Sequence, residues 1–273
     1  MTEFIQKHKL FSFYSMLMLI VVFIAIFAPW LALGDAFTSN MSQALQAPSA
    51  QHWFGTDKLG RDVLSRIIYG TQLSLFMGVS IVVIMVTIGT VIGAVAGYFG
   101  GKIEIVLMRM ADIMLSFPGV VLAIAIAGIL GGSIVNTILA LSVVGWAKYA
   151  RIVRSLTLKV RGEEYVTAAV MMGASTGTIL RRHIIPNILP LVVTTGALDI
   201  GAIMIEVAGL SFLGFGAQPP TPEWGLMLNE GRQYLQTSPW LMVFPGMSIL
   251  LVVAIFNLWS DSLRDVVDPK NQG

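Results

Sequence analysis

The residues able to carry out covalent or metal chemistry are few and widely spaced along the chain. There are three histidines, His8, His52 and His183, and no cysteine. Metal sites need several such ligands at close spacing, so we expect no preassembled metal site. The Gly-Lys pair at 101–102 lacks the spacing of a phosphate-binding loop, because Ile103 stands where that motif requires Ser or Thr. We also find no catalytic triad or zinc-protease motif, and we expect the chain to bind no cofactor.

Two carboxylates lie inside long apolar runs, where ionisable groups are uncommon. Asp199 and Glu206 are seven residues apart, which places them on one face of a helix. A carboxylate at membrane depth usually faces a cavity or a partner, so we expect Glu206, and Asp199 nearer the inner half, to line a polar path. A packing contact or a hydrogen bond to a neighbouring helix is the alternative for both. Asp112, near the start of another apolar run, is expected at the interface.

The polar stretch 163–190, EEYVTAAVMMGASTGTILRRHIIPNILP, interrupts this apolar chain. Glu163 and Glu164 suit the first turn of a helix, where the helix dipole favours acids. One helix face then follows at helical spacing, formed by Val166, Ala169, Val170 and Gly173. Gly173 can end the helix, because glycine accepts a left-handed cap.

A second short helix is expected after Gly173. Ser175 or Thr176 can cap its start, and Arg181, Arg182 and His183 are expected in its last turn, where cations are favoured. Pro186 is expected to stop it, because the residue before a proline avoids helical backbone. The small residues Ala168, Ala169 and Gly173 predict a surface that a soluble partner's groove can approach. A simple connector resting on the membrane surface is the alternative.

The elements that carry these residues are mostly apolar. Hydrophobic residues make up 56% of the 273-residue chain and charged residues only 12%, against about 25% charged in soluble domains. Several runs exceed the ~18 residues that cross about 30 Å of hydrocarbon. We predict an all-α membrane protein with six transmembrane helices, at residues 10–33, 73–99, 103–130, 134–153, 191–215 and 240–258. A cleaved signal peptide is the alternative for the first run, but its apolar core would span only about 7–15 residues.

The distribution of Lys and Arg predicts the orientation of these helices. With both termini in the cytoplasm, most of the 17 basic residues face inward. The inward-facing residues are Lys7, Lys9, Lys102, Arg109, Lys148, Arg151, Arg154, Lys159, Arg161, Arg181, Arg182, Arg264 and Lys270. The outward-facing residues are Lys58, Arg61, Arg66 and Arg232. The predicted segments are an N-terminal tail and first helix (1–33), an external segment (34–71), a core (72–262) with an inner loop (155–190), and a C-terminal tail (263–273).

Two external segments carry polar residues that can contact a partner. Asp57–Arg61 and Asp62–Arg66 are spaced four apart, which predicts a short amphipathic external helix. The sequence QPPTPEWG, ending in Glu223, Trp224 and a glycine, predicts a stiff external loop. We expect docking or gating at Asp57, Arg61, Asp62, Glu223 and Trp224, with a merely solvated helix and a merely stiffened loop as the alternatives.

Three motifs resemble one family in the same order. The stretch 163–190 resembles the cytoplasmic coupling loop of ABC importer permeases, whose pattern is Glu-Ala-Ala, three residues, then Gly. Ala168, Ala169 and Gly173 match it, but Thr167 stands in place of the glutamate, with Glu163 and Glu164 one turn earlier. HWFGTDKLGRDVLSRIIYG and LSFLGFGAQPPTPEWGLMLNEGRQYL resemble external segments of the dipeptide, oligopeptide and nickel branch, and DSLRDVVDPK resembles its C-terminal end. Within this branch, ALDIGAIMIEVAGLSFLG resembles the nickel-type second permease more than the dipeptide type.

This resemblance implies a type I importer permease in the bacterial cytoplasmic membrane. It implies a homologous permease, two ATP-binding subunits and an extracytoplasmic binding protein as partners, with the bilayer around the chain and no nucleic acid. The coupling loop would contact an ATPase through Glu163, Glu164, Ala168, Ala169, Gly173 and Arg181. ATP and Mg²⁺ would be used by the ATPase subunits, and the cargo would be nickel, another metal (free or chelated) or a short peptide.

Two other functions fit part of the pattern. An ion-coupled secondary transporter would need a relay near the midplane, for which only Asp199 and Glu206 are available, and it would leave the inner loop unexplained. A membrane-embedded hydrolase would have to use Asp112, Asp199, Glu206 or His183. Uptake that survives ATP depletion would indicate the first, and turnover without any ATPase subunit would indicate the second.

Overall fold

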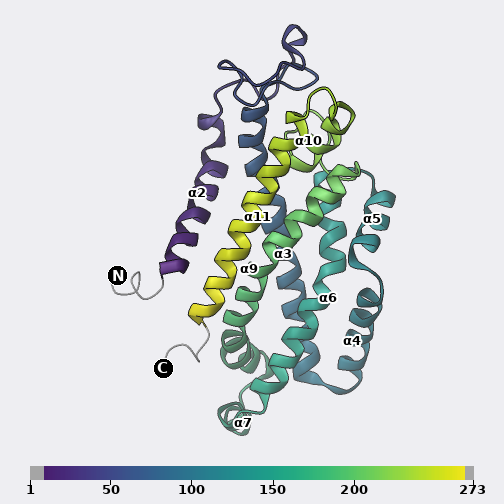
Figure 1. Ribbon diagram of the computed structural model, residues 1–273. Coiled ribbons are helices and arrows are strands. Elements are labelled where there is room, and N and C mark those ends of the chain that lie inside the picture. Colours follow the sequence, from purple (N-terminus) through teal and green to yellow (C-terminus); the bar gives the residue numbers. More distant parts are fainter. Residues whose placement is uncertain (1–8, 268–273) are drawn as a thin grey trace. The chain divides into compact units, whose positions relative to one another are not determined.

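The chain is mostly helical, and the computed structural model describes residues 9–267 (Figure 1). The longer helices are α2 (Lys9–Leu31), α3 (Val63–Phe99), α4 (Gly101–Ser116), α5 (Gly119–Leu130), α6 (Ile134–Arg161), α9 (Ile185–Phe212) and α11 (Trp240–Val267). The shorter ones are α7 (Glu164–Met171), α8 (Thr176–Ile179) and α10 (Trp224–Gly231), with 3-10 turns at Met41–Gln43 and Arg232–Tyr234 and a π turn at Leu180–Ile184. The all-α prediction is confirmed. Predictions for the chain ends, including Lys7, His8 and Lys270, lie outside the described residues.

Four of the predicted membrane crossings are helices long and apolar enough to span a bilayer. They are Lys9–Leu31, Val63–Phe99, the continuous stretch Thr176–Phe212, and Trp240–Arg264 within α11. The predicted fourth crossing corresponds to α6, which is less apolar because its second half carries Lys148, Arg151 and Arg154. The count of six crossings, with both termini on one side, stays a prediction.

The predicted third crossing, 103–130, is not one helix. The chain breaks between α4 and α5, and these two helices are bent by 91°. Pro118 explains the break, because proline has no amide hydrogen to donate and disfavours helical backbone in the residue before it. Phe117 is accordingly extended, with φ −98° and ψ 147°. The prediction of one uninterrupted helix here is wrong.

Pro186 does not end the second helix of the polar stretch, contrary to the prediction. The π turn at Leu180–Ile184 leads directly into α9, which runs through both Pro186 and Pro190. The Ile185 amide bonds the carbonyl of Leu180, five residues back. This wider turn changes the hydrogen-bond register just before Pro186, so the missing amide falls at a helix irregularity. The polar stretch is therefore continuous with α9.

The chain divides into two compact units, each with its own core. Within the described chain, the first unit comprises residues 9–79, 127–138 and 198–267, and the second comprises 80–126 and 139–197. In the first unit, α11 packs against both α2 and α10. Its core includes Val21, Ala25, Val63, Ile67, Trp224, Val252, Val253 and Phe256. The buried centre of the second unit is smaller and lies around Trp146 of α6 and Ala111 of α4.

Close packing of α3 on α6 holds the second unit together. Gly89, Gly93 and Gly97 recur every four residues on α3 and face α6. A Cβ atom on Gly93 would lie 2.7 Å from the Cβ of Val153, and one on Gly97 would lie 2.8 Å from the carbonyl oxygen of Arg154. Small residues permit such close approach between membrane helices. The glycines therefore fix the position of α6, whose C-terminal end leads into α7.

Candidate functional site

The polar stretch 163–190 forms α7 and α8, joined by a tight turn at Gly173. Gly173 has φ +80°, its amide bonds the carbonyl of Val170 at 3.0 Å, and the Ala174 amide bonds the carbonyl of Ala169 at 3.1 Å. These paired bonds form a Schellman cap, whose left-handed position glycine adopts without strain. The predicted role of Gly173 in ending the first helix is confirmed.

Only one of the two helix starts in this stretch has a side-chain cap. The Ser175 Oγ accepts a bond from the Thr178 amide at 3.4 Å, which confirms Ser175 as a cap. Glu163 stands at the N-cap of α7 without a side-chain cap bond, and Glu164 lies in the first turn. The Thr167 hydroxyl donates to the Glu163 carbonyl at 3.4 Å. Thr167 is thus turned back onto its own helix, where the family pattern has a glutamate.

Large apolar side chains are exposed along α7 and at its C-cap, and their exposure was not predicted from the sequence. Met171 and Met172 are 83% and 82% exposed, and Tyr165 and Val170 are also exposed. Comparable exposure is found on the long apolar helices, where lipid covers such side chains, but on a short helix of a polar stretch it marks a candidate contact surface. We call Tyr165, Val170, Met171 and Met172 the α7 patch. Two adjacent methionines in the sequence are the signal that could have identified it.

The small residues expected to face a partner are divided between surface and interior. Ala168 and Gly173 are exposed, and no atom lies within 4 Å of a Cβ placed on Gly173. Ala169 is buried and packs inward together with Val166. Arg181 is exposed on the π turn that follows α8. Therefore α7 is anchored by one face and presents the other to solvent.

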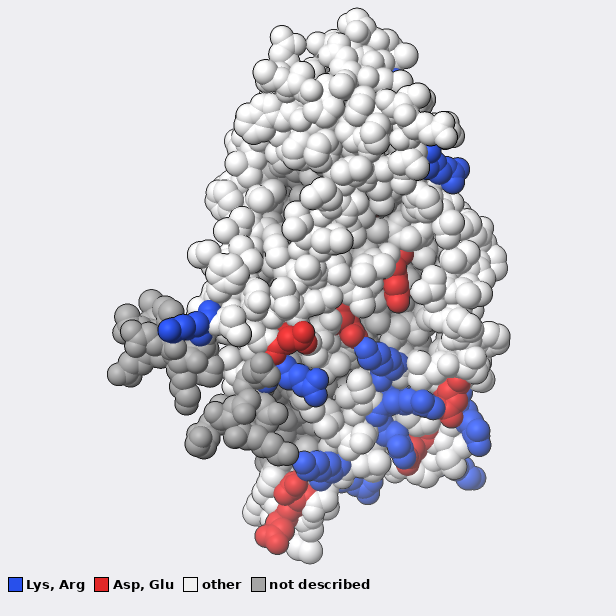
Figure 2. All heavy atoms as spheres, viewed as in Figure 1, with Lys and Arg blue, Asp and Glu red and all other residues white. Residues whose placement is uncertain are grey.

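Charged side chains surround this region. In Figure 2 they gather over the ends of α4, α6 and α7. The exposed ones in these elements and in the adjoining turns are Lys102, Arg109, Lys148, Arg151, Lys159, Arg161, Glu163, Glu164, Arg181 and Arg182. These residues include most of the cations that the charge bias assigns to the inner side of the membrane.

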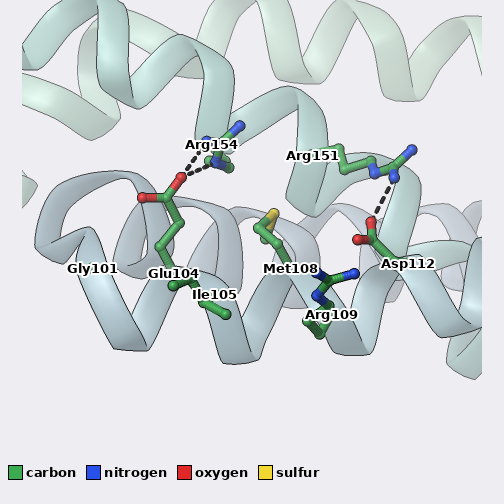
Figure 3. Close-up of a pocket in the computed structure, with 8 residues that line it drawn as sticks. All are labelled: Gly101, Glu104, Ile105, Met108, Arg109, Asp112, Arg151 and Arg154. Carbon is green, nitrogen blue, oxygen red and sulfur yellow. Dashed lines mark hydrogen bonds and ion pairs between the residues drawn. The ribbon is translucent and has the colours of Figure 1, made fainter.

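A pocket of about 590 Å³ lies between α4 and α6 (Figure 3). Arg151 of α6 donates to the Asp112 carboxylate of α4 at 2.5 Å, and the Arg154 Nε donates to Glu104 at 2.6 Å. Arg109 also lines the pocket. Asp112 thus forms an ion pair. The sequence predicted only that it lies at the membrane interface. The spacing of Glu104 and Asp112 on one face of α4 is the sequence signal for this pocket.

Asp57, Arg61 and Asp62, from the segment predicted to be external, are buried in the first unit, with exposed fractions of 8%, 1% and 6%. They do not lie on a helix, so the predicted amphipathic helix is wrong. The Asp57 carboxylate accepts bonds from the amides of Leu59 and Arg61, and Gly60 turns the chain at φ +76°. A side chain bonded to its own backbone two residues on competes with helix formation.

These residues belong to a buried ion cluster that joins distant parts of the first unit. Arg61 bonds Asp57 at 2.6 Å and reaches Glu230 of α10 at 3.5 Å. Arg66 lies 3.5 Å from Asp57 and 3.3 Å from the same Glu230 carboxylate. The predicted Asp62–Arg66 pair does not form, since Asp62 instead contacts the His52 Nδ1 at 2.9 Å. We call Asp57, Arg61, Arg66 and Glu230 the cap cluster.

Glu223 and Trp224 are also buried, at 0% and 1% exposure. The Glu223 carboxylate caps α10 by accepting bonds from the amides of Gly225 and Leu226 at 2.9 and 2.8 Å. Burial raises the pKa of Glu223, and these hydrogen bonds oppose that rise. The Trp224 Nε1 donates to the Ile67 carbonyl at 3.1 Å. In this structure neither side chain is accessible to a docking partner.

The carboxylates Asp199 and Glu206 lie on α9, and both are half-buried. Their role in lining a path stays a prediction. Among residues 9–267, no group of three or more His, Asp or Glu side chains is arranged to hold a metal ion. His52 is engaged with Asp62, and the His183 ring lies 6.1 Å from that of Tyr165.

The family described as the binding-protein-dependent transport system inner membrane component matches residues 89–273. The chain is 45% identical over 266 residues to a dipeptide transport system permease, DppC, of Alkalihalophilus pseudofirmus, covering 97% of this chain and 88% of that protein. It is 44% identical over 260 residues to the glutathione transport system permease GsiD of Escherichia coli, covering 95% and 86%.

The chain belongs to this family. It is a permease subunit of a bacterial ABC importer and a multi-pass protein of the inner membrane, and separate subunits hydrolyse the ATP. Family membership sets aside the ion-coupled transporter and the membrane-embedded hydrolase. The structure of the methionine ABC transporter MetNI shares the permease's fold, with a TM-score of 0.55 at 18% identity over 75% of this chain and 97% of that chain. Permeases of this class work with a second permease, ATPase subunits and a substrate-binding protein.

The nickel-type assignment finds no support among these relatives, which are named for dipeptides and glutathione. That assignment rested on a few residues of α9. Residues of a membrane helix serve packing as well as cargo, so a short match there is a poor guide to the substrate.

Proposed function

We propose that this permease forms half of a peptide-conducting pore and that residues 163–190 transmit the movement of an ATPase subunit to it. The second half would be a homologous permease, with two ATPase subunits and an extracytoplasmic binding protein completing the importer. The permease itself would bind no cofactor, and the partner ATPases would use ATP and Mg²⁺. The peptide names of its relatives support this cargo.

The exposed α7 patch carries the coupling part of the proposal. A short helix that buries one face and exposes Tyr165, Met171 and Met172 presents an apolar anchor to a groove. Methionine side chains adapt their shape to such a groove, which suits a contact that moves during a cycle. Glu163, Glu164 and Arg181 in the same stretch are exposed, and we propose that they supply the polar rim of this contact.

The continuity of this stretch with α9 supports transmission. The π turn at Leu180–Ile184 and α9 form one unbroken path from α8 into the membrane. Ile179, Ile184 and Ile188 are buried along it. Because these side chains are closely packed, a displacement of α7 should be transmitted to α9. Asp199 and Glu206 lie further along α9, and we propose that they line the path taken by the peptide.

The test replaces the apolar anchor with charge. The double substitution Met171→Glu, Met172→Glu should leave the protein in the membrane but abolish co-purification with the ATPase subunits. ATP-driven uptake of a dipeptide into proteoliposomes should fall at least about tenfold, as expected when residues that fill the centre of an interface are lost.

Met41→Glu is the matched control, because Met41 is also an exposed methionine, at 67%, but lies in the segment before α3. It should retain its ATPase subunits. If the double variant keeps its ATPase subunits and transports normally, α7 is not the coupling contact. If the wild-type importer takes up nickel and no peptide, the proposed cargo is wrong.

A further inference from the structure

The pocket between α4 and α6 belongs to neither the proposed coupling contact nor the proposed peptide path. Three guanidinium groups, from Arg109, Arg151 and Arg154, meet two carboxylates, from Glu104 and Asp112. Each carboxylate is already engaged by an α6 arginine. The pocket therefore carries an excess of positive charge.

Arg109 supplies that excess. It is exposed, and among the described residues no ion pair to it is found. In Figure 3 its side chain lies on α4 beside Met108 and Asp112, along the same wall of the pocket. Arg151, although paired with Asp112, remains 55% exposed and has donors to spare. Arg109 and Arg151 thus both offer guanidinium donors to an anionic group in this pocket.

The surface next to this pocket is apolar. Ile105, which lines the pocket, is 59% exposed, and Val106 and Met110 on the same helix are 58% and 51% exposed. On a membrane helix such side chains contact acyl chains. A ligand that fits both features has an anionic head and an apolar tail.

We infer that this pocket holds the headgroup of an anionic phospholipid. Guanidinium groups match phosphate oxygens in geometry, and basic pockets between membrane helices on the cytoplasmic side are typical sites for acidic headgroups. The charge bias assigns Arg109, Arg151 and Arg154 to that side. A zwitterionic peptide fits less well, because it needs a free carboxylate for its ammonium group, and both carboxylates are engaged by arginines.

The bound lipid has a structural consequence in the second unit. A phosphate bridging Arg109 of α4 and Arg151 of α6 adds a link between these two helices. α6 continues into the segment that carries α7. The lipid therefore stabilises the α4–α6 packing next to the coupling segment. This inference concerns the membrane and does not depend on the identity of the cargo.

The experiment measures lipid retention by native mass spectrometry on the full-length permease with its co-purified subunits. Detergent-solubilised protein is titrated with phosphatidylglycerol or with phosphatidylcholine of identical acyl chains. The wild type should retain phosphatidylglycerol preferentially. Arg109→Gln should lower that retention about fivefold, the contribution of one arginine near a lipid surface. Asp112→Asn should raise it, because Arg151 loses its carboxylate partner.

Arg182→Gln, which removes an exposed arginine outside the pocket, is the control and should retain the lipid as the wild type does. Equal retention of the two lipids, no effect of Arg109→Gln, or a decrease in Asp112→Asn would overturn the inference. Displacement of phosphatidylglycerol by inorganic phosphate would indicate a free-phosphate site, and displacement by a dipeptide would indicate a cargo site. Either displacement also overturns it.

Discussion

The segment before α3 and the segment after α6 differ in which side chains they bury and which they expose. In the first, Arg61 and Arg66 are buried, at 1% and 0% exposure, and form ion pairs with Asp57 and Glu230. In the second, methionines of α7 are largely exposed and the nearby charges lie at the surface. Buried ion pairs hold the elements that carry them in one arrangement, whereas an exposed apolar patch is available to bind a partner. We therefore interpret the first as a rigid cap and the second as a contact surface.

The largest effect should follow from breaking the cap cluster. Glu230→Met leaves Arg61 and Arg66 buried with Asp57 as their remaining carboxylate, and should destabilise the protein by about 3–5 kcal/mol. The thermal unfolding midpoint of the purified permease in detergent measures this. Lys58→Met is the control, because this Glu230 partner is 37% exposed and should cost about 0–1 kcal/mol. Similar losses in both variants would contradict a buried, rigid cap.

The cap of α10 should give the next effect. Glu223→Ala removes an acceptor for two amides and should cost about 1–2 kcal/mol. Because the raised pKa makes the folded state hold its proton to higher pH than the unfolded state, stability should fall as pH rises above the ordinary carboxyl range. Glu223→Gln keeps a neutral acceptor and should abolish this part of the pH dependence. A stability that rises with pH through Glu223 would contradict the sign.

The turn at Gly173 should show a local effect. Gly173→Ala forces a side chain into the left-handed region at φ +80° and should cost roughly 1–2 kcal/mol. Hydrogen exchange of the α7 amides should therefore be about 5–30 times faster. Gly177→Ala is the matched control, since Gly177 has open space around it, lies within α8 and has no positive φ. Equal exchange in the two variants would show that α7 does not depend on the Gly173 cap.

The smallest effect is expected at the surface of the second unit. Asp112→Asn removes the partner of Arg151, but both side chains are well exposed, at 39% and 55%. Its cost in unfolding free energy should be about 0–1 kcal/mol and should shrink further in high salt. A loss of stability as large as that caused by Glu230→Met would contradict the contrast between buried ion pairs in the first unit and exposed ones in the second.

Features set by neighbouring residues could be predicted from the sequence. Gly173 and Ser175 act within a few residues of themselves, and both roles are confirmed. The long apolar runs predicted six crossings, and four of them are helices able to span a membrane. Pro118 was also available from the sequence as a signal for the break, but the predicted crossing at 103–130 took no account of it.

Features set by distant residues could not be predicted. The cap cluster joins Arg61 to Glu230, which are 169 positions apart, and no local pattern indicates that contact. The spacing of Asp57 and Arg61 predicted a helix, but a turn around Gly60 brings the same two side chains together. Burial of Ala169 and exposure of Met171 depend on what packs beneath α7. Spacing alone predicted a face but not which face points outward.

Labelling of a single cysteine tests the contact-surface interpretation most directly, because the natural chain contains no cysteine. Met171→Cys and Met41→Cys place one thiol on α7 or in the segment before α3, and both would be labelled with a maleimide in the complete importer and in the permease alone. We predict that assembly with the ATPase subunits slows labelling of the Met171→Cys variant at least about tenfold and leaves the Met41→Cys variant unchanged. Equal labelling of Met171→Cys with and without the ATPase subunits would contradict the account.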